Sequence, residues 1–411
     1  MPDTTLHLLT FGTLYPNAAQ PHHGVFVENR LRHLVASGEA ASTVLAPAPY
    51  FPRGRLAASI GRRFGWQHFA QAPRHEIRNG IAVHHPRFPT IPKFGMNLAP
   101  FLLARAAMAE VRRLLDQGVR IDLIDAHYVY PDGVAAVMLA QHFHLPVTIT
   151  ARGSDVTQLP DFAMPRRMIK WAIGQADALI SVSAALGQRL IELGADPAKV
   201  TVLRNGIDTD LFRPVERESV RREIGLPDGA KLLISVGHLI ERKRCHLTID
   251  AIALLPEVHL AIVGDGPERA GLQAQAERLG LADRVHFLGA RPHDALPGYY
   301  AAADAMVLAS SREGWANVLL EAMACGTPVI ASDIPGNPEV VQSREAGLIL
   351  RENSPEGIAE AARGLFADPP DRAATRAYAE RFGWEETTQG QLRVFRDVLA
   401  RQGAKGKGKT A

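Results

Sequence analysis

The chain has few cysteines and no long apolar run. Only Cys245 and Cys325 occur among its 411 residues, which is too few for a disulfide framework and typical of a reducing compartment such as the cytosol. No stretch reaches the roughly 18 uninterrupted apolar residues expected of a membrane-spanning helix. The N-terminus, Met-Pro-Asp-Thr-Thr, lacks the basic and apolar regions of a signal peptide. We therefore expect a cytoplasmic protein whose membrane contacts, if it has any, are peripheral and on the inner face.

The chain also lacks a strong overall charge, but its charges are unevenly distributed. The formal net charge is +3, and such a total favours neither nucleic acid nor a membrane as a partner. Residues 51–113, however, hold eleven Lys and Arg residues against two acidic ones, so this segment carries +9 and the rest of the chain −6. Aromatic residues interleave with these cations, at Phe64, Trp66, Phe69, Phe94 and Phe101. This combination predicts contact with an anionic lipid surface; the alternative is a solvated, arginine-rich face, and we expect no nucleic acid partner.

Two further patterns are missing. The segment Gly264-Asp-Gly266 lacks the third small residue of a dinucleotide fingerprint and does not follow the first strand, which argues against hydride-transfer chemistry. No Asp-x-Asp pair stands at the end of a predicted strand, so we expect no catalytic metal. We expect no cofactor either.

Short apolar runs alternate with helical patterns along the chain, which predicts parallel sheets with helices on both faces. The predicted strands are Leu6–Phe11, Ser42–Ala46, Ile81–His85, Ile121–His127, Val147–Ala151, Ala178–Val182, Val200–Leu203, Lys231–Val236, Val258–Val263, Val285–Leu288, Ala305–Leu308, Pro328–Ala331 and Gly347–Leu350. We expect two doubly wound domains, a final helix and a disordered low-complexity tail, at residues 1–205, 206–378, 379–402 and 403–411. Ligands of such sheets bind beyond the carboxyl ends of the strands.

Two glutamates stand in a segment that is otherwise almost wholly apolar. Residues 316–325 predict a core helix, so Glu321 would be buried and would need donors, either a protein cation or the hydroxyls of a ligand. Asn317 lies one turn earlier on the same face. Glu313 precedes the helix beside Gly314, where unpaired backbone N–H groups suit a phosphate. The alternative is a structural salt bridge and a surface glutamate.

The spacing of these glutamates resembles the E-x7-E motif of family 4 retaining glycosyltransferases. Further segments resemble motifs of that family in the same order, at residues 202–214, 236–243, 263–267, 285–289 and 299–304. The resemblance covers nearly the whole chain and is most specific at residues 200–345. It implies the GT-B fold, in which two Rossmann-like domains face each other across a cleft and the last helix crosses back to the N-terminal domain. It also implies a nucleoside-diphosphate sugar as the donor substrate.

The resemblance assigns roles on the donor side. Lys243 matches the family's phosphate lysine, and His238 stands where the family usually has an arginine, so its charge would depend on pH. Cations are needed here because sugar transfer builds negative charge on the departing phosphate. Glu313 would bind sugar hydroxyls and Glu321 the ribose. The other expected donor contacts are Gly24, Asn205, Gly314, Asn317, Val318, Leu319 and, near the nucleobase, Arg291.

The first domain would supply the rest of the site. His127 ends a predicted strand and is similar to the family's histidine that touches the donor sugar, which makes it a catalytic candidate. Arg152 stands where the family commonly has the histidine of His-Gly-x-Asp, and Asp155 matches that motif's aspartate. Both are acceptor-side candidates, although Asp155 could equally cap a turn or a helix.

The expected activity is transfer of a sugar, with retention of configuration and without a metal, to a saccharide or lipid-linked saccharide. A cell-surface polysaccharide or a glycolipid would be the product. Two alternatives stay open: a nucleotide-sugar epimerase on the same scaffold and a non-catalytic nucleotide-sugar-binding protein.

Overall fold

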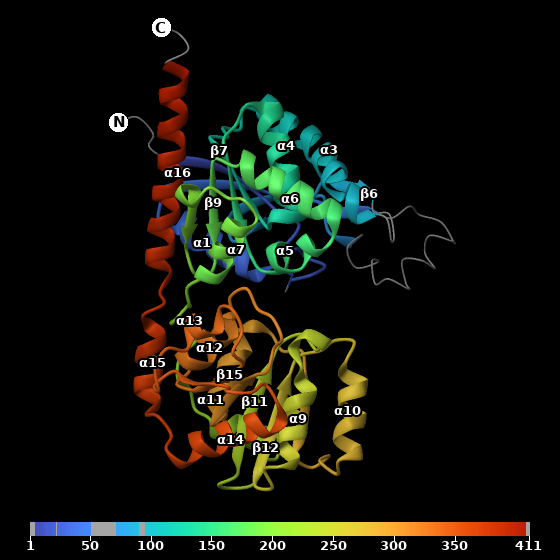
Figure 1. Ribbon diagram of the computed structural model, residues 1–411, viewed down its shortest axis with the longest axis vertical. Coiled ribbons are helices and arrows are strands. Elements are labelled where there is room, and N and C mark those ends of the chain that lie inside the picture. The colour runs from blue at the N-terminus through green and yellow to red at the C-terminus, as the bar shows by residue number, and fades with distance from the viewer. Residues whose placement is uncertain (1–4, 22, 51–70, 90–94, 408–411) are drawn as a thin grey trace, which may run out of the picture. The chain divides into compact units, whose positions relative to one another are not determined.

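The computed structural model describes residues 5–21, 23–50, 71–89 and 95–407. The chain forms two compact units (Figure 1). The first consists of Met1–Asn205 together with Glu385–Ala411, and the second of Gly206–Trp384. The second unit thus extends six residues past the boundary expected at 378. It does so because α15 (Arg372–Glu380) packs on α12 (Asn317–Ala324), where Arg376 donates to the carbonyl of Ala324 (2.8 Å).

The first unit is built on a sheet with the strand order β10-β9-β8-β7-β1-β2-β5-β4, in which only the pairing of β4 with β5 is antiparallel among the described strands. Its strands are β1 (Leu6–Phe11), β2 (Ala40–Leu45), β4 (His75–Arg78), β5 (Ile81–His84), β7 (Leu123–His127), β8 (Val147–Ala151), β9 (Ala178–Ser181) and β10 (Val200–Val202). The central strands β7, β8 and β9 are buried at every position, as expected of parallel strands covered on both faces. A small parallel pair, β3 (Ala48–Tyr50) and β6 (Arg87–Pro89), lies beside this sheet.

Helices cover both faces of the first sheet. The core of one face joins the sheet to α1 (Val25–Ala36) and α16 (Trp384–Lys407) through Leu31, Leu392 and Phe395. On the opposite face α3 (Gly95–Asp116), α4 (Val134–Phe143) and α6 (Ala163–Gln175) pack together over β7 and β8 (Figure 1). Shorter helices follow β8 and β9, namely α5 (Ser154–Thr157) and α7 (Ala184–Glu192).

The last helix is longer than expected. We expected disorder from Gly403, but α16 continues to Lys407. Extending an existing helix fixes one more residue for each added hydrogen bond, and alanine and lysine are good helix formers, so the glycines are tolerated. The rest of the expected tail, residues 408–411, lies outside the described residues.

The second unit is built on a fully parallel sheet with the order β13-β12-β11-β14-β15-β16. Its strands are β11 (Lys231–Val236), β12 (Val258–Val263), β13 (Val285–Gly289), β14 (Ala305–Leu308), β15 (Val329–Ala331) and β16 (Gly347–Ile349). The strand order reverses between β11 and β14, and ligands of doubly wound sheets bind beyond the strand ends at such a switch point. The loops after Val236 and Leu308 lie at this switch point.

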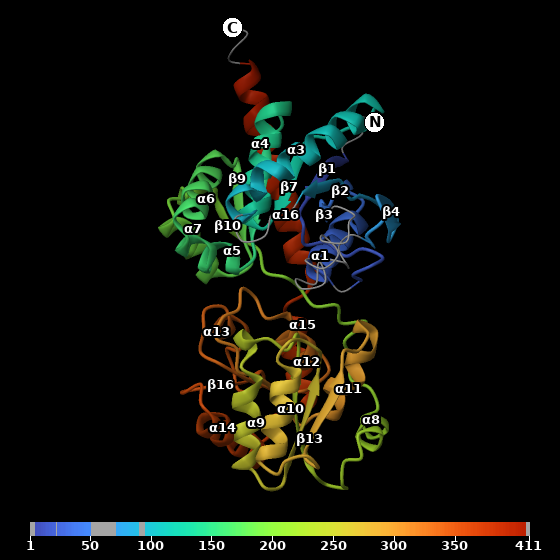
Figure 2. The ribbon, with the colours of Figure 1, turned by 90° about the vertical axis from the view of Figure 1, so that its right-hand side faces the viewer.

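The helices of the second unit also lie on both faces of its sheet (Figure 2). Leucines and isoleucines of α9 (Cys245–Ala253), α10 (Arg269–Arg278) and α14 (Pro355–Ala367) form one core with the sheet. The remaining helices are α8 (Glu218–Glu223), α11 (Leu296–Ala302), α12, α13 (Asn337–Val340) and α15. Within the described part of the chain, no helix is both long enough and apolar enough to span a bilayer.

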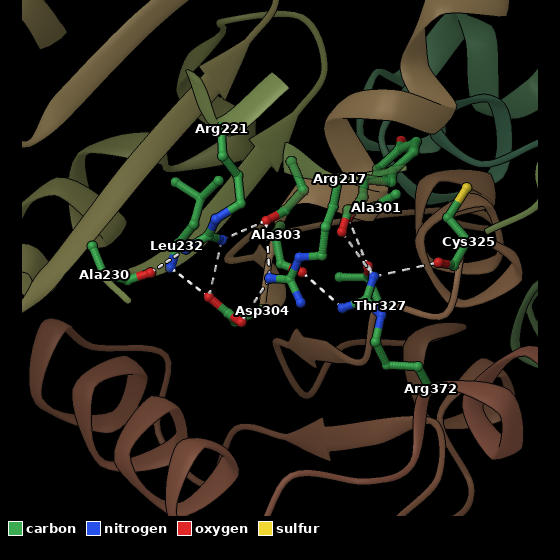
Figure 3. A network of polar contacts seen from close by, with 12 residues as sticks. Arg217, Arg221, Ala230, Leu232, Ala301, Ala303, Asp304, Cys325, Thr327 and Arg372 are labelled. Atoms are coloured by element: carbon green, nitrogen blue, oxygen red, sulfur yellow. Dashed lines mark hydrogen bonds and ion pairs between the residues drawn. The ribbon is translucent and has the colours of Figure 1, made fainter. Parts of the chain in front are cut away.

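Arginines hold the end of α11 in place (Figure 3). Arg372 donates to the carbonyl of Ala301 (2.9 Å), and Arg221 donates to that of Ala302 (2.8 Å). Asp304 accepts from Arg217 (3.0 Å) in the same network. Cations at a helix C-terminus satisfy its unpaired carbonyls and its negative dipole end, so this network fixes the turn between α11 and β14.

Candidate active site

The loop after β11 carries the cations of the second unit. The chain leaves Val236 through Gly237 (φ 146°) and reaches a 3-10 turn at Glu241–Lys243. A Cβ atom on Gly264, which follows β12, would lie 1.9 Å from the carbonyl oxygen of Gly237. Only glycine allows the ends of β11 and β12 to touch at this point.

Glu313 joins this loop to the loop after β14. Its Oε1 lies 2.8 Å from Nζ of Lys243, and its Oε2 lies 3.1 Å from a guanidinium nitrogen of Arg242. Burial opposes ionisation of Glu313, but Lys243 and Arg242 outweigh it and lower the pKa of this carboxyl group. The cluster of Arg242, Lys243 and Glu313 therefore has a net charge of +1 and stands at the switch point.

Arg242 was not among the site residues predicted from the sequence. It also donates to the carbonyl of Arg312 (2.7 Å), while its own carbonyl accepts from the backbone N–H of Ser311 (2.8 Å). The run Arg242-Lys243-Arg244 was the available signal, but it did not reveal which of the three cations turns toward Glu313.

Glu321 is buried in α12, as the apolar pattern of that segment predicts, and its donors come from an aromatic residue and a histidine. The hydroxyl of Tyr300 donates to Oε2 (2.8 Å), and Nε2 of His293 lies 3.5 Å from Oε1. The hydrogen bond with Glu321 raises the pKa of His293 against the effect of desolvation. His293 also meets the ring of Phe212 edge-on, with centroids 5.0 Å apart.

The helix start at α12 and the other donor-side candidates have local partners. The N–H of Asn317 donates to the carbonyl of Trp315 (3.2 Å), and the N–H of Leu319 donates to that of Ala316 (3.0 Å). Val318 between them is half-buried. A Cβ on Gly336 would lie 3.0 Å from the carbonyl oxygen of Gly314, so two turns meet there. The roles assigned to Gly314, Asn317, Val318 and Leu319 stay predictions.

His238 and Arg291 lie at the surface of the second unit. Nδ1 of His238 donates to the carbonyl of Asp265 (2.6 Å). Arg291 pairs with Glu223 of α8 (3.4 Å) and stacks over the ring of Tyr299 (5.3 Å). Their roles toward a phosphate and a nucleobase also stay predictions.

A buried polar chain lies at the carboxyl ends of β7 and β8 in the first unit. It runs from Asp125 to His127 (3.2 Å), from His127 to Arg152 (2.7 Å), and from Arg152 to Asn205 (3.2 Å). Arg30 of α1 donates to the same Asn205 oxygen (3.3 Å). All five residues are buried. The structure thus brings three sequence candidates together, His127, Arg152 and Asn205.

Asp155 and Gly24 both contact the backbone of the first unit. The carboxylate of Asp155 accepts from the N–H groups of Val129 (2.8 Å), Arg152 (3.1 Å) and Gly153 (2.7 Å). These contacts are those of a residue that caps a turn, which was the alternative to an acceptor contact. Gly24 begins α1 with φ 74°, and a Cβ there would lie 2.4 Å from the carbonyl oxygen of Leu14. A substrate role for either residue stays a prediction.

Family models match both units of the chain. Residues 216–382 match the model of the family "Glycosyl transferases group 1", and residues 24–211 match that of "Glycosyltransferase Family 4". The chain is 29% identical to the putative teichuronic acid biosynthesis glycosyltransferase TuaC of Bacillus subtilis, over 87% of this chain and 88% of that protein. It is 31% identical to the N-acetyl-alpha-D-glucosaminyl L-malate synthase of Bacillus anthracis, over 73% and 80%.

Solved structures show the same fold. Sucrose-phosphate synthase from Thermosynechococcus elongatus superposes with a TM-score of 0.78 at 21% identity, covering 97% of this chain and all of that one. Anabaena HepE in complex with UDP superposes with a TM-score of 0.70 at 22% identity, covering 96% and 100%. The expected GT-B fold, with two Rossmann-like α/β domains and a C-terminal helix, is confirmed.

Proposed function

The chain belongs to the group 1 glycosyltransferases of family 4, and we propose that it is a retaining enzyme that uses a nucleoside-diphosphate sugar. The observation that carries the proposal is the cluster of Arg242, Lys243 and Glu313 at the switch point of the second unit. A departing nucleoside diphosphate gains negative charge, and preorganised cations stabilise that charge in the transition state. Solved relatives of this fold were obtained with UDP, UDP-glucose and ADP.

Each residue of the cluster has a proposed task. Lys243 and Arg242 bind the diphosphate, and Glu313 turns to the hydroxyls of the donor sugar when the phosphate takes over its cations. Glu321 binds the ribose. With two side-chain cations as counter-charge, no metal is needed in this scheme, and retention follows from front-face attack assisted by the leaving phosphate.

We propose a saccharide or lipid-linked saccharide as the acceptor and a cell-surface polysaccharide or glycolipid as the product. The name of the Bacillus subtilis relative supports this, since it refers to teichuronic acid biosynthesis. Peripheral contact with an anionic membrane belongs to the same proposal, because a lipid-linked acceptor would lie at the membrane surface.

The test combines donor binding with turnover. Calorimetric titration with UDP, GDP, ADP and dTDP sugars identifies the base, and product analysis with the donor that binds identifies the reaction. Lys243→Ala should lower the transfer rate more than it weakens nucleotide binding, because its charge matters most as the phosphate departs. Arg344→Ala, a change at a half-exposed arginine of the second unit, is the matched control.

The outcomes separate the proposal from its alternatives. Transfer to an acceptor with retained configuration supports it. Interconversion of donor sugars without an acceptor would identify an epimerase, and binding without turnover would identify a nucleotide-sugar-binding protein.

A further inference from the structure

The contacts of His127 fix which of its ring nitrogens carries hydrogen. A guanidinium has five N–H donors and no acceptor. One guanidinium nitrogen of Arg152 lies 2.7 Å from Nδ1 of His127, so Nδ1 must accept and carries no hydrogen. Nε2 lies 3.2 Å from Oδ2 of the Asp125 carboxylate. The ring is therefore neutral, with its hydrogen on Nε2.

The charges around the ring favour the same state. Asp125 of β7, Arg152 after β8 and Arg30 of α1 face His127, and the carboxylate of Asp155 binds the backbone of Arg152. The ring is only 2% exposed, so an imidazolium would be a third buried cation beside two guanidinium groups. Burial lowers the pKa of His127, and Arg152 and Arg30 lower it further against the attraction of Asp125.

Arg152 is itself held firmly. Its second guanidinium nitrogen donates to Oδ1 of Asn205 (3.2 Å), and its guanidinium lies over the ring of Phe26 at 5.3 Å from the centroid. Oδ1 of Asn205 also accepts from Arg30, which in turn donates to Gln391 of α16 (2.9 Å). The donor that faces Nδ1 therefore has a fixed position.

We infer that Arg152 is a positioning residue that keeps His127 neutral and in its Nε2–H form across the pH range in which a free histidine gains charge. A neutral histidine at position 152 could donate or accept, so it would not dictate the tautomer of its neighbour, whereas an arginine can only donate. The guanidinium groups of Arg152 and Arg30 are then the cations of this buried polar chain, and His127 acts through a ring of fixed polarity. The inference rests on the proposed function only where activity is measured.

The tautomer can be measured without a substrate. In protein with 15N-labelled histidine, long-range 1H–15N spectra distinguish a protonated from an unprotonated ring nitrogen, and His127→Gln identifies the signals of His127. We expect an unprotonated Nδ1, a protonated Nε2 and no titration between about pH 5.5 and 8.5, a range centred near the ordinary histidine pKa. A hydrogen on Nδ1, or a titration midpoint inside this range, would overturn the inference.

Substitution at Arg152 tests the cause. Arg152→Met removes the donor at similar length, so His127 should become titratable with Asp125 as its counter-ion. Arg152→Lys keeps a donor and should restore the neutral form. Arg189→Met, which removes a guanidinium of the same unit that binds Val156 and Glu192, is the matched control. A His127 that stays neutral in Arg152→Met would also overturn the inference, and if that variant fails to fold, the spectra of the parent protein and of Arg152→Lys still decide.

Activity gives an independent readout. If Arg152 sets the charge of His127, kcat/KM of Arg152→Met relative to the parent should fall by about tenfold for each pH unit below the new His127 midpoint. The spectra need neither donor nor acceptor, so the two proposals fail separately. A neutral His127 in a protein without transfer activity would contradict the proposed function alone, and a titrating His127 in an active enzyme would contradict this inference alone.

Discussion

At the scale of single residues, Asp132 links proton binding to stability. Burial raises its pKa to about 7, although the backbone N–H and the hydroxyl of Thr13 donate to it (2.7 and 3.1 Å). The folded pKa lies above the unfolded value, so the folded protein keeps a proton that the unfolded chain loses between about pH 4 and 7. The free energy of unfolding should therefore fall as the pH rises through this window.

Asp132→Asn cannot ionise and should escape this loss. We expect it to be more stable than the parent at pH 8 by roughly 4 kcal/mol, from about 1.4 kcal/mol per unit of pKa difference, and of similar stability near pH 4.5. Urea unfolding at both pH values measures the difference. An equal difference at the two pH values would show that Asp132 is ionised in the folded protein throughout.

His293 should show a dependence of the same sign, at higher pH. Its pKa is raised by the hydrogen bond with Glu321, so the stability it contributes is complete below the unfolded pKa and is lost as the pH rises through the folded one. His293→Gln should therefore destabilise the protein more at pH 5.5 than at pH 9. Thermal unfolding across this range checks the sign, with His246→Gln, at a histidine on the exposed side of α9, as the control. A loss that is larger at pH 9 would contradict the pairing with Glu321.

The sequence could predict that Glu321 is buried and needs donors, because an apolar helix around a carboxylate leaves no other solution. It could not name Tyr300 and His293, since these reach Glu321 only through the packing of α11 on α12. Arg152 became a candidate because it stands where the family's His-Gly-x-Asp motif has a histidine. Its contact with His127 depends on the register of β8 beside β7, which no local pattern shows.

At the scale of elements, the arginine network of Figure 3 should stabilise the second unit. Arg372 donates to the carbonyls of Ala301 and Ala303 (2.9 and 3.0 Å) and to the hydroxyl of Thr327 (2.9 Å). Arg372→Met would leave these buried groups without a donor, and each such group costs about 1–3 kcal/mol. We expect a loss of roughly 3 kcal/mol in the free energy of unfolding of the second unit.

Chemical unfolding followed by tryptophan fluorescence measures this loss. Arg344→Met is the matched control, because Arg344 also donates to helix-end carbonyls, those of Gly364 and Asp368, but at the exposed surface. It should cost less than about 1 kcal/mol. Equal losses in the two variants would mean that burial of the carbonyls at α11 does not decide the energy.

Most elements were predictable from apolar runs, and each exception has a structural reason. The strand β4 was not predicted because its residues are mostly polar and exposed. The turn between β4 and β5 holds Asn79 and Gly80, which both have positive φ (49° and 78°). An Asn-Gly pair is the signal of a tight hairpin turn. This signal was present in the sequence. The pairing of β3 with β6, in contrast, joins chain segments 39 residues apart, and no local pattern predicts it.

At the scale of the whole molecule, the net charge of residues 51–113 overstates the charge that a membrane would meet. Arg78 pairs with Glu28 (2.8 Å), Arg113 pairs with Glu110 (2.5 Å), and Arg87 donates to the carbonyl of Ala72. Other members of the predicted surface lie outside the described residues, namely Arg53, Arg55, Arg62, Arg63, Phe64, Trp66, Phe69, Lys93 and Phe94. The described part includes the outer side of α3, where Leu98 and Phe101 are 46% and 49% exposed and Arg105 is exposed one turn further on.

This side of α3 allows a sharp test of the proposed membrane contact. Positions 98, 101 and 105 follow the helical repeat, so two large apolar side chains and a cation point the same way and suit the interface of an anionic bilayer. The double variant Leu98→Ser, Phe101→Ser should reduce co-sedimentation with anionic vesicles by about tenfold, a loss of roughly 1.4 kcal/mol. Leu115→Ser, at an exposed leucine near the other end of α3, should have little effect.

Added salt should weaken the binding of the parent protein, because each basic residue near the surface contributes about 1 kcal/mol through a screened interaction. Equal recovery of the parent with neutral and anionic vesicles at low salt would exclude this contact and favour an acceptor that is not presented on a membrane.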